Sequence, residues 1–85
     1  MLSKSAEVLI LDDHVIIRRG LRNLISSRIS GIKVHDVASL QGLFERLNGG
    51  HVPDVLILDL QLADGNALER LEELRTRWPS LRILV

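Results

Sequence analysis

Two apolar runs dominate the hydrophobic pattern of this chain, and neither shows the polar alternation of a half-exposed strand. They cover residues 8–11 and 55–58, and both read VLIL. Runs of this length and composition are typical of strands that are covered on both faces, as in a parallel sheet. Acidic residues follow directly, Asp12 and Asp13 after the first run and Asp59 after the second. The pattern therefore predicts two buried strands with carboxylates at their C-terminal ends.

The segment between Asp13 and Gly31 has the spacing of an amphipathic helix, and Asp13 is its expected N-cap. Apolar residues recur every three to four positions along one side, and polar residues occupy the other. After Gly31, apolar and polar residues alternate over 32–37, which predicts a strand at the edge of the sheet. The expected buried stripe of the helix is Ile17, Leu21, Leu24 and Ile25, and the residues expected to face water are Arg18, Arg19, Arg22 and Asn23.

A second helix is predicted to begin after Ser39, a favourable N-cap. It ends at Gly49 and Gly50, a pair typical of a helix-terminating turn. These glycines do not form a phosphate-binding loop, because no Lys followed by Ser or Thr stands at the required spacing. The stripe expected to be buried is Leu40, Leu43, Phe44 and Leu47.

A third helix is predicted to begin after Asn66, with Glu69 as a reciprocal cap, and to end at Pro79. Glu73 and Arg77 are one turn apart and can form an ion pair. Residues 81–85 then predict a fourth strand. The stripe expected to be buried is Ala67, Leu71, Leu74 and Trp78.

Alternation of strands and helices with short connections implies right-handed crossovers and a parallel sheet flanked by helices. With the alternating strand at the edge, the expected strand order is 2-1-3-4. Strands one and three are then neighbours, so Asp12, Asp13 and Asp59 converge at the carboxyl end of the sheet, where such folds bind ligands. Three close carboxylates repel one another, which either raises the pKa of some of them or requires a hard cation with oxygen ligands. Magnesium (Mg2+) is the simplest such cation.

Length and composition narrow the class of protein. The chain has 85 residues, 11 basic and 11 acidic side chains, and no cysteine. This length predicts a single domain, and the zero net charge gives no reason to expect contact with nucleic acid or an anionic membrane. The absence of cysteine agrees with a reducing compartment, and no apolar run approaches the roughly 18 residues of a membrane span. We therefore expect a soluble, cytoplasmic protein.

The motifs resemble those of the receiver domains of two-component response regulators, especially the subgroup joined to a LuxR-type helix-turn-helix DNA-binding domain. The resemblance covers the whole chain. It rests on three segments in the expected order, namely residues 8–14 (VLILDDH), 19–21 (RGL) and 53–60 (PDVLILDL). It implies a flavodoxin-like, receiver-type α/β fold.

By this resemblance, Asp59 is the phosphoacceptor, which receives a phosphoryl group from a sensor histidine kinase with Mg2+ as the cofactor. Asp13 is expected to bind the ion directly and Asp12 largely through water. Together with Asp59 itself, the backbone carbonyl of Gln61 completes the expected metal ligands. The resemblance implies a signalling domain rather than an enzyme, in which the aspartyl phosphate is the signal.

The chain also departs from the family pattern. It ends at Val85, so residues 1–85 are expected to be the N-terminal portion of a single receiver domain without an output domain. The fifth strand, the last helices, and the Ser or Thr and Lys that hold the phosphoryl oxygens would be missing, which leaves switching incomplete. Ala63, Ala67 and Val15 stand where the family or subgroup often has proline, glycine and proline respectively. An uncovered fourth strand predicts self-association through its edge.

Other interpretations stay open. Acidic residues at strand ends often serve only as helix caps, and Arg18, Arg19 and Arg22 could form a kinase contact or merely a solvated face. A phosphatase of the haloacid dehalogenase kind typically needs a second aspartate where this chain has Gln61. The stronger alternative is a phosphorylation-independent interaction or dimerisation module on a receiver scaffold. The three histidines, which show no ligand spacing among themselves, are expected to be surface residues: His14, His35 and His51.

Overall fold

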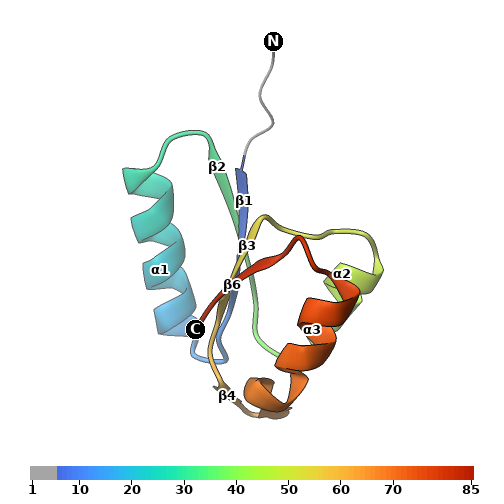
Figure 1. Cartoon of the computed structure of the whole chain (residues 1–85). Coiled ribbons are helices and arrows are strands. Elements are labelled where there is room, and N and C mark those ends of the chain that lie inside the picture. The colour runs from blue at the N-terminus through green and yellow to red at the C-terminus, as the bar shows by residue number, and fades with distance from the viewer. Residues whose placement is uncertain (1–5) are drawn as a thin grey trace.

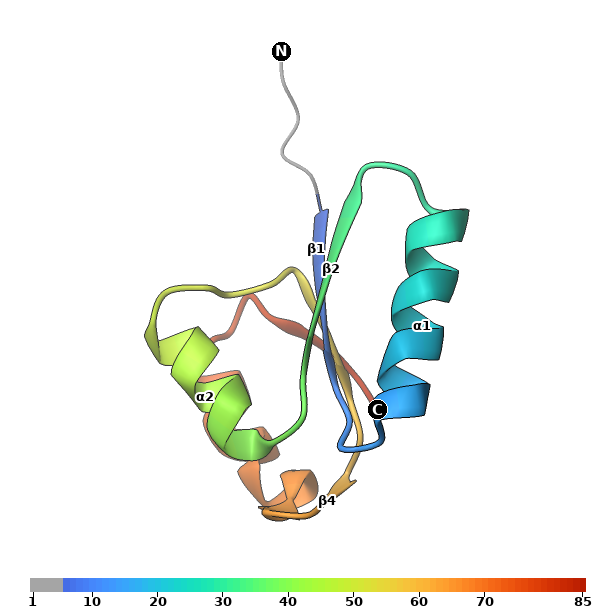
Figure 2. The same ribbon diagram turned by 180° about the vertical axis from the view of Figure 1, so that it is seen from behind.

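A computed structural model describes residues 6–85 of the chain. Its main sheet contains four parallel strands in the order β2-β1-β3-β6, as the sequence predicts. The strands are β1 (Ala6–Leu11), β2 (Ile32–Val37), β3 (Val55–Leu58) and β6 (Arg82–Leu84). Figures 1 and 2 show that helix α1 (Val15–Arg28) lies alone on one face, while α2 (Leu40–Asn48) and α3 (Leu71–Arg77) lie on the other.

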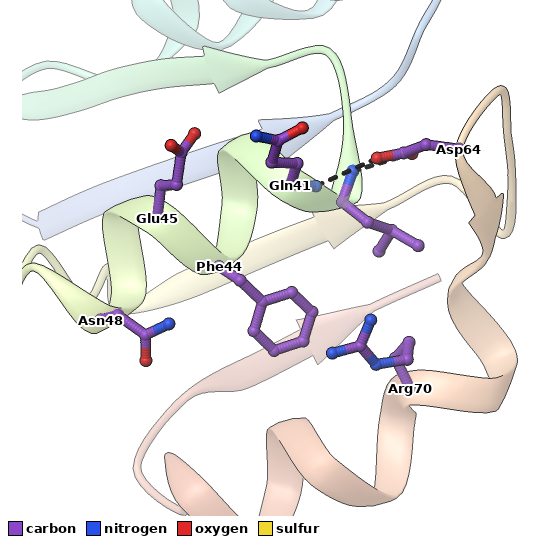
Figure 3. A pocket seen from close by; sticks show the side chains of 7 residues that line it. Gln41, Phe44, Glu45, Asn48, Asp64 and Arg70 are labelled. Atoms are coloured by element: carbon purple, nitrogen blue, oxygen red, sulfur yellow. Dashed lines mark hydrogen bonds between the residues drawn. The ribbon is translucent and has the colours of Figure 1, made fainter.

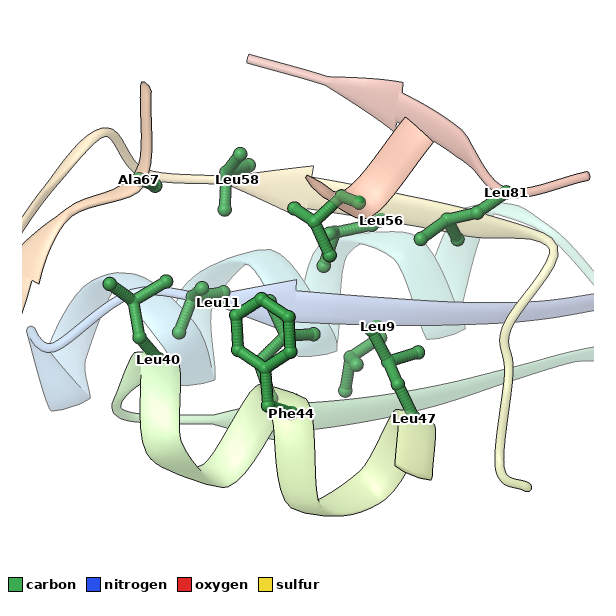
Figure 4. Packing of buried hydrophobic residues seen from close by; sticks show 11 residues of the cluster. Leu9, Leu11, Leu40, Phe44, Leu47, Leu56, Leu58, Ala67 and Leu81 are labelled. Atoms are coloured by element: carbon green, nitrogen blue, oxygen red, sulfur yellow. The ribbon is translucent and has the colours of Figure 1, made fainter. Parts of the chain in front are cut away.

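Most of the hydrophobic core lies between the sheet and the helices α2 and α3 (Figure 4). Leu43 and Leu74 point from the two helices into this layer and are fully buried, as is Leu56 on β3. The predicted stripe of α2 is buried throughout, whereas Leu71 and Trp78 at the ends of α3 are only partly buried against the same cluster. Nearly all the side chains of this layer are leucine, so it is held together by aliphatic packing. The buried members are Leu9, Leu11, Leu40, Leu43, Phe44, Leu47, Leu56, Leu58, Ala67, Leu74 and Leu81.

The face beneath α1 is less well covered, and here the predicted stripe was partly wrong. No residue of α1 is buried; Ile17 is 49% exposed and Leu24 is 51% exposed. Leu21 and Ile25 do pack against a small cluster on β1 and β2. The physical reason is the position of α1, which contacts β1 and β2 and has no helix beside it on this face among residues 6–85 (Figure 2). One side of its apolar stripe therefore faces solvent.

The capping of α1 also differs from the prediction. His14, not Asp13, occupies the N-cap position, and its side chain makes no cap hydrogen bond. Asp12 instead closes the turn before the helix, because its Oδ1 accepts a hydrogen bond from the His14 backbone N–H at 2.8 Å. Asp13 is directed elsewhere, as described below. The local turn thus uses the first acid and leaves the second free for a long-range contact.

The start and end of α2 agree with the sequence. Ser39 Oγ accepts a hydrogen bond from the Gly42 N–H at 3.0 Å, which confirms the predicted N-cap. After the helix, Gly50 has φ +87°, a left-handed conformation that favours glycine, and its N–H donates to the Leu47 carbonyl. The glycine pair is therefore a helix-terminating turn.

The connection between β3 and α3 has more structure than a simple loop. A short antiparallel pair, β4 (Gln61–Leu62) and β5 (Gly65–Asn66), precedes a 3₁₀ turn, η1 (Ala67–Arg70), which leads into α3. Asn66 caps this turn by accepting a hydrogen bond from the Leu68 N–H at 2.9 Å, as predicted. Within residues 6–85 we find no reciprocal bond from Glu69. The predicted Glu73–Arg77 ion pair is present at 3.1 Å.

Candidate functional site

The ends of β1 and β3 place the predicted acidic residues together. The two strands run parallel in a register that sets Leu11 beside Leu58, so the acid after each strand emerges at the same edge. The Asp59 N–H donates to the Leu11 carbonyl at 3.0 Å, and the Asp12 N–H donates to the Val37 carbonyl at 3.2 Å. Backbone hydrogen bonds between strands therefore fix where these residues leave the sheet.

Four side chains meet at this edge: Asp12, Asp13, His14 and Asp59. One potential ligand atom from each lies within 4.8 Å of all the others. The three carboxylates are partly shielded from solvent, with 13% of the Asp12 side chain, 26% of Asp13 and 29% of Asp59 exposed. We call these four residues the acidic cluster. Its negative charges are close enough to repel one another strongly unless a cation lies between them.

The two oxygens of Asp13 have different environments. Oδ2 accepts a hydrogen bond from the Ala63 N–H at 3.0 Å, which ties the segment after Asp59 back to the end of β1. Oδ1 is buried and has no hydrogen-bond partner among the described residues. His14 Nδ1 is 3.1 Å from this oxygen, but Nδ1 also lies at 2.8 Å from Asp12 Oδ1, with which it forms its hydrogen bond.

An orphaned carboxylate oxygen inside a group of acids is well suited to a hard divalent cation, which binds carboxylate and carbonyl oxygens. The donor set of Asp12, Asp13 and Asp59 therefore fits Mg2+. Gln61 follows two positions after Asp59, and its N–H donates to Asp59 Oδ1 at 3.2 Å. This bond holds the Gln61 backbone close to the cluster.

His14 belongs to the cluster, although sequence reasoning considered it only as a surface residue. Its side chain is 67% exposed, yet Nδ1 faces all three carboxylates. The hydrogen bond to Asp12, with the nearby charges of Asp13 and Asp59, raises the pKa of His14 above its ordinary value. The signal available in the sequence was its position directly after two acids.

Comparison with known proteins agrees with this architecture. Residues 8–85 match the response regulator receiver domain family. The chain belongs to this family. It is 35% identical over 79 residues to the DNA-binding transcriptional activator DevR/DosR of Mycobacterium tuberculosis, a match that covers 93% of this chain and 36% of that protein. It is 37% identical over 83 residues to the nitrate/nitrite response regulator protein NarL of Escherichia coli K12, covering 94% and 37% respectively.

Solved structures of receivers are similar as well. A LuxR family DNA-binding response regulator from Silicibacter pomeroyi superposes with a TM-score of 0.79 at 29% identity, covering 92% of this chain and 60% of that one. A two-component response regulator of the LuxR family from Aurantimonas gives a TM-score of 0.75 at 33% identity, covering 93% and 56%. The expected resemblance to the LuxR subgroup and the receiver-type fold are thus confirmed. The chain spans about a third of the length of the curated relatives it matches.

In this receiver chain, Arg18 supports the site from behind, contrary to the prediction that it faces water. Only 17% of its side chain is exposed. Its Nη1 donates to the Asp12 carbonyl at 2.9 Å, and its Nε donates to Asp36 Oδ2 at 3.2 Å. Arg22 lies 3.5 Å from the other oxygen of Asp36. Arg18 therefore links α1 and β2 to the backbone of the cluster, and Arg19 alone of the three arginines has no such ion pair among the described contacts.

The receiver also has a hollow of about 330 Å³ between α2 and η1, and no member of the acidic cluster lines it (Figure 3). The Arg70 guanidinium lies 4.2 Å from the centre of the Phe44 ring, and Asp64 also lines the hollow.

Both Asp64 oxygens accept hydrogen bonds from the first N–H groups of α2, those of Leu40 and Gln41, each at 3.1 Å. These bonds lower the pKa of Asp64. Its role is thus to anchor the loop after Asp59 to α2.

No helix among residues 6–85 combines the length and the apolar character needed to cross a bilayer.

Proposed function

We propose that this chain is the phosphoacceptor part of a two-component response regulator. A sensor histidine kinase would supply the phosphoryl group as a phosphohistidine, and Asp59 would accept it. The observation that carries the proposal is the convergence of Asp12, Asp13 and Asp59 within one small cluster at the carboxyl end of two parallel strands. Membership of the receiver family supports the same conclusion.

In the proposed transfer, a carboxylate oxygen of Asp59 attacks phosphorus, and the bond between phosphorus and the histidine nitrogen of the kinase breaks. Asp59 Oδ1 accepts a hydrogen bond from the Gln61 N–H, which orients the carboxylate and leaves Oδ2 on the side of the cluster. Mg2+, when bound, offsets the negative charge on the attacking and transferring oxygens. Asp12, Asp13, Asp59 and the Gln61 carbonyl would hold it. The domain itself turns over no substrate in this scheme, so we class it as a signalling domain and not an enzyme.

A small acyl phosphate can replace the kinase in a direct test. The protein is incubated with acetyl phosphate and Mg2+, and intact mass spectrometry is used to detect the mass of one added phosphoryl group. We expect uptake by the natural sequence, none by Asp59→Asn, and unchanged uptake by Glu69→Gln, which removes an exposed acid outside the cluster. Equal uptake by Asp59→Asn, or no uptake at millimolar Mg2+, would contradict the assignment.

We also propose that the 85-residue polypeptide associates with itself through the outer edge of β6. Among the described residues, no strand pairs with that edge, and Leu84 and Val85 beside it are 59% and 72% exposed. An open strand edge with apolar side chains is a template for pairing with another chain.

Self-association is tested by multi-angle light scattering over a range of protein concentrations. We expect a mass above that of the monomer, which falls when Leu84→Lys places a charge on the edge. A monomer at all concentrations would exclude this interface.

Because the net charge is zero, we propose no contact of this segment with nucleic acid. By similarity to its relatives, we propose that the protein lies in the cytoplasm.

A further inference from the structure

The loop between β3 and η1 is attached to the acidic cluster through its backbone. The Gln61 N–H donates to Asp59 Oδ1 at 3.2 Å, and the Ala63 N–H donates to Asp13 Oδ2 at 3.0 Å. Two carboxylates from different strand ends therefore each have one oxygen held by this loop. Because a hydrogen bond weakens steeply when its geometry changes, the position of the loop backbone determines how these two carboxylates are oriented.

Asp64, the residue after Ala63, attaches the same loop to the start of α2 (Figure 3). Its Oδ1 accepts a hydrogen bond from the Leu40 N–H and its Oδ2 accepts one from the Gln41 N–H, each at 3.1 Å. N–H groups in the first turn have no partner within a helix, and an anionic side chain is favoured there. The contact with the acidic cluster and the contact with α2 thus come from adjacent residues of the loop.

The loop also fits closely against α2 by shape. Gly65 has φ +150°, which side chains rarely allow, and a Cβ at this position would lie 3.1 Å from Leu40 Cδ1. Leu62 packs against the main core cluster, and the Ala67 N–H donates to the Leu60 carbonyl at 2.8 Å. Polar and steric contacts therefore both hold the loop in this place.

The helix to which Asp64 is attached is itself fixed, because its apolar stripe is buried throughout. We propose that Asp64 is a positioning residue for phosphoryl transfer: by holding the loop to α2, it keeps the Gln61 and Ala63 N–H groups where they orient Asp59 and Asp13. Among the described contacts, Asp64 makes no hydrogen bond or ion pair with the acidic cluster, so it acts only through the loop. The inference rests on the proposed function, since it concerns the rate at which Asp59 is phosphorylated.

The rate of phosphorylation by acetyl phosphate at saturating Mg2+ tests the inference. A misplacement of about 1 Å can cost about a hundredfold in rate, so a loop shift of roughly a quarter to half of that should lower the maximal rate of Asp64→Ala about three- to tenfold. The acetyl phosphate concentration that gives half the maximal rate should not change, because Asp64 does not contact the donor. Asp64→Asn keeps one acceptor oxygen and should be intermediate.

Two further variants separate positioning from a general loss of stability. Gly65→Ala disturbs the same contact with α2 through Leu40, so it should also lower the maximal rate. Glu69→Gln, which removes an exposed acid from the same connection, should react at the natural rate. Rates are compared at a temperature at which circular dichroism shows each variant to be folded.

A second measurement follows the loop without phosphoryl transfer. In nitrogen-15 spectra of the ion-free protein, the Gln61 and Ala63 amide resonances should move in Asp64→Asn and stay in place in Glu69→Gln. This measurement also reports whether each variant is folded.

The outcomes distinguish this inference from the proposed function. If the natural chain is phosphorylated on Asp59, but folded Asp64→Ala and Gly65→Ala react at the natural rate, Asp64 is only a structural residue; the inference is overturned and the phosphoacceptor stands. Unchanged Gln61 and Ala63 resonances in Asp64→Asn would overturn it equally. If the natural chain takes up no phosphoryl group, the proposed function fails and the role of Asp64 in transfer fails with it.

Discussion

The unequal covering of the two sheet faces leads to a prediction that one type of substitution can test. Leu43 on α2 is completely buried, whereas Leu24 on α1 is 51% exposed. Changing each leucine to alanine removes the same atoms from a helix interior. Only at position 43 are those atoms enclosed by the main core, so the two variants should lose very different amounts of stability.

The magnitudes follow from burial. For Leu43→Ala, loss of transfer free energy together with the cavity left behind predicts a decrease of about 2–5 kcal/mol in the free energy of unfolding. For Leu24→Ala, about half of the side chain is already in water and no closed cavity forms, so we expect a loss of about 1 kcal/mol or less. A chain of this length has a total stability of about 4–13 kcal/mol, so Leu43→Ala removes a large part of it.

Urea denaturation followed by circular dichroism at low protein concentration measures both losses. The dependence of the unfolding free energy on urea should be the same for the two variants, so that the midpoints report stability alone. Equal losses would refute the conclusion that α1 packs weakly. A cost at Leu24 that grows with protein concentration would indicate instead that association of two chains covers this face.

Three smaller perturbations test individual contacts around the site. Arg18→Ala should lower stability by about 1–3 kcal/mol in urea titrations, because the backbone of Asp12 and the carboxylate of Asp36 lose a shared donor, whereas Arg19→Ala should have almost no effect. His14→Ala should destabilise the ion-free protein at low pH. Because folding raises the pKa of His14, its side chain contributes fully to stability below about pH 6.5, and this contribution is lost as pH rises through the pKa of the folded state. Thermal melts of the variant and the natural chain should therefore converge at alkaline pH. Asp64→Asn should destabilise the protein at neutral pH. The difference in melting temperature from the natural chain should shrink as pH falls through the lowered pKa of Asp64, where the natural carboxylate becomes protonated. A difference that grows on acidification would contradict the role of Asp64 as an anionic cap of α2.

The sequence was sufficient for the sheet because the information needed there is local. Residues 8–11 and 55–58 are apolar at every position, which identifies buried strands, and the alternation in 32–37 identifies an edge. The order 2-1-3-4 then follows from placing this alternating strand at the edge of a parallel sheet. The stripe of α1 could not be interpreted equally well, because periodicity gives the direction of an apolar face but not the width of the surface that covers it.

The contacts of the site were less predictable for a related reason. Asp13 was expected to cap α1, but its Oδ2 accepts from the Ala63 N–H, fifty positions away in the chain. A cap is a local interaction that sequence patterns capture well, whereas the competing partner is brought close only by the completed fold. Arg18 was similarly assigned to solvent because it is charged, although it borders the apolar stripe of the helix and reaches Asp36 on β2.

The geometry of the cluster depends finally on the apolar strands beside it. The pairing of Leu11 with Leu58 is the last step of a register in which Leu9 pairs with Leu56, and all four side chains are buried on the same face. A shift of one strand by a single residue would turn its leucines to the opposite face and move Asp59 along the edge, away from Asp12. Burial of aliphatic side chains therefore holds mutually repelling carboxylates within reach of one ion.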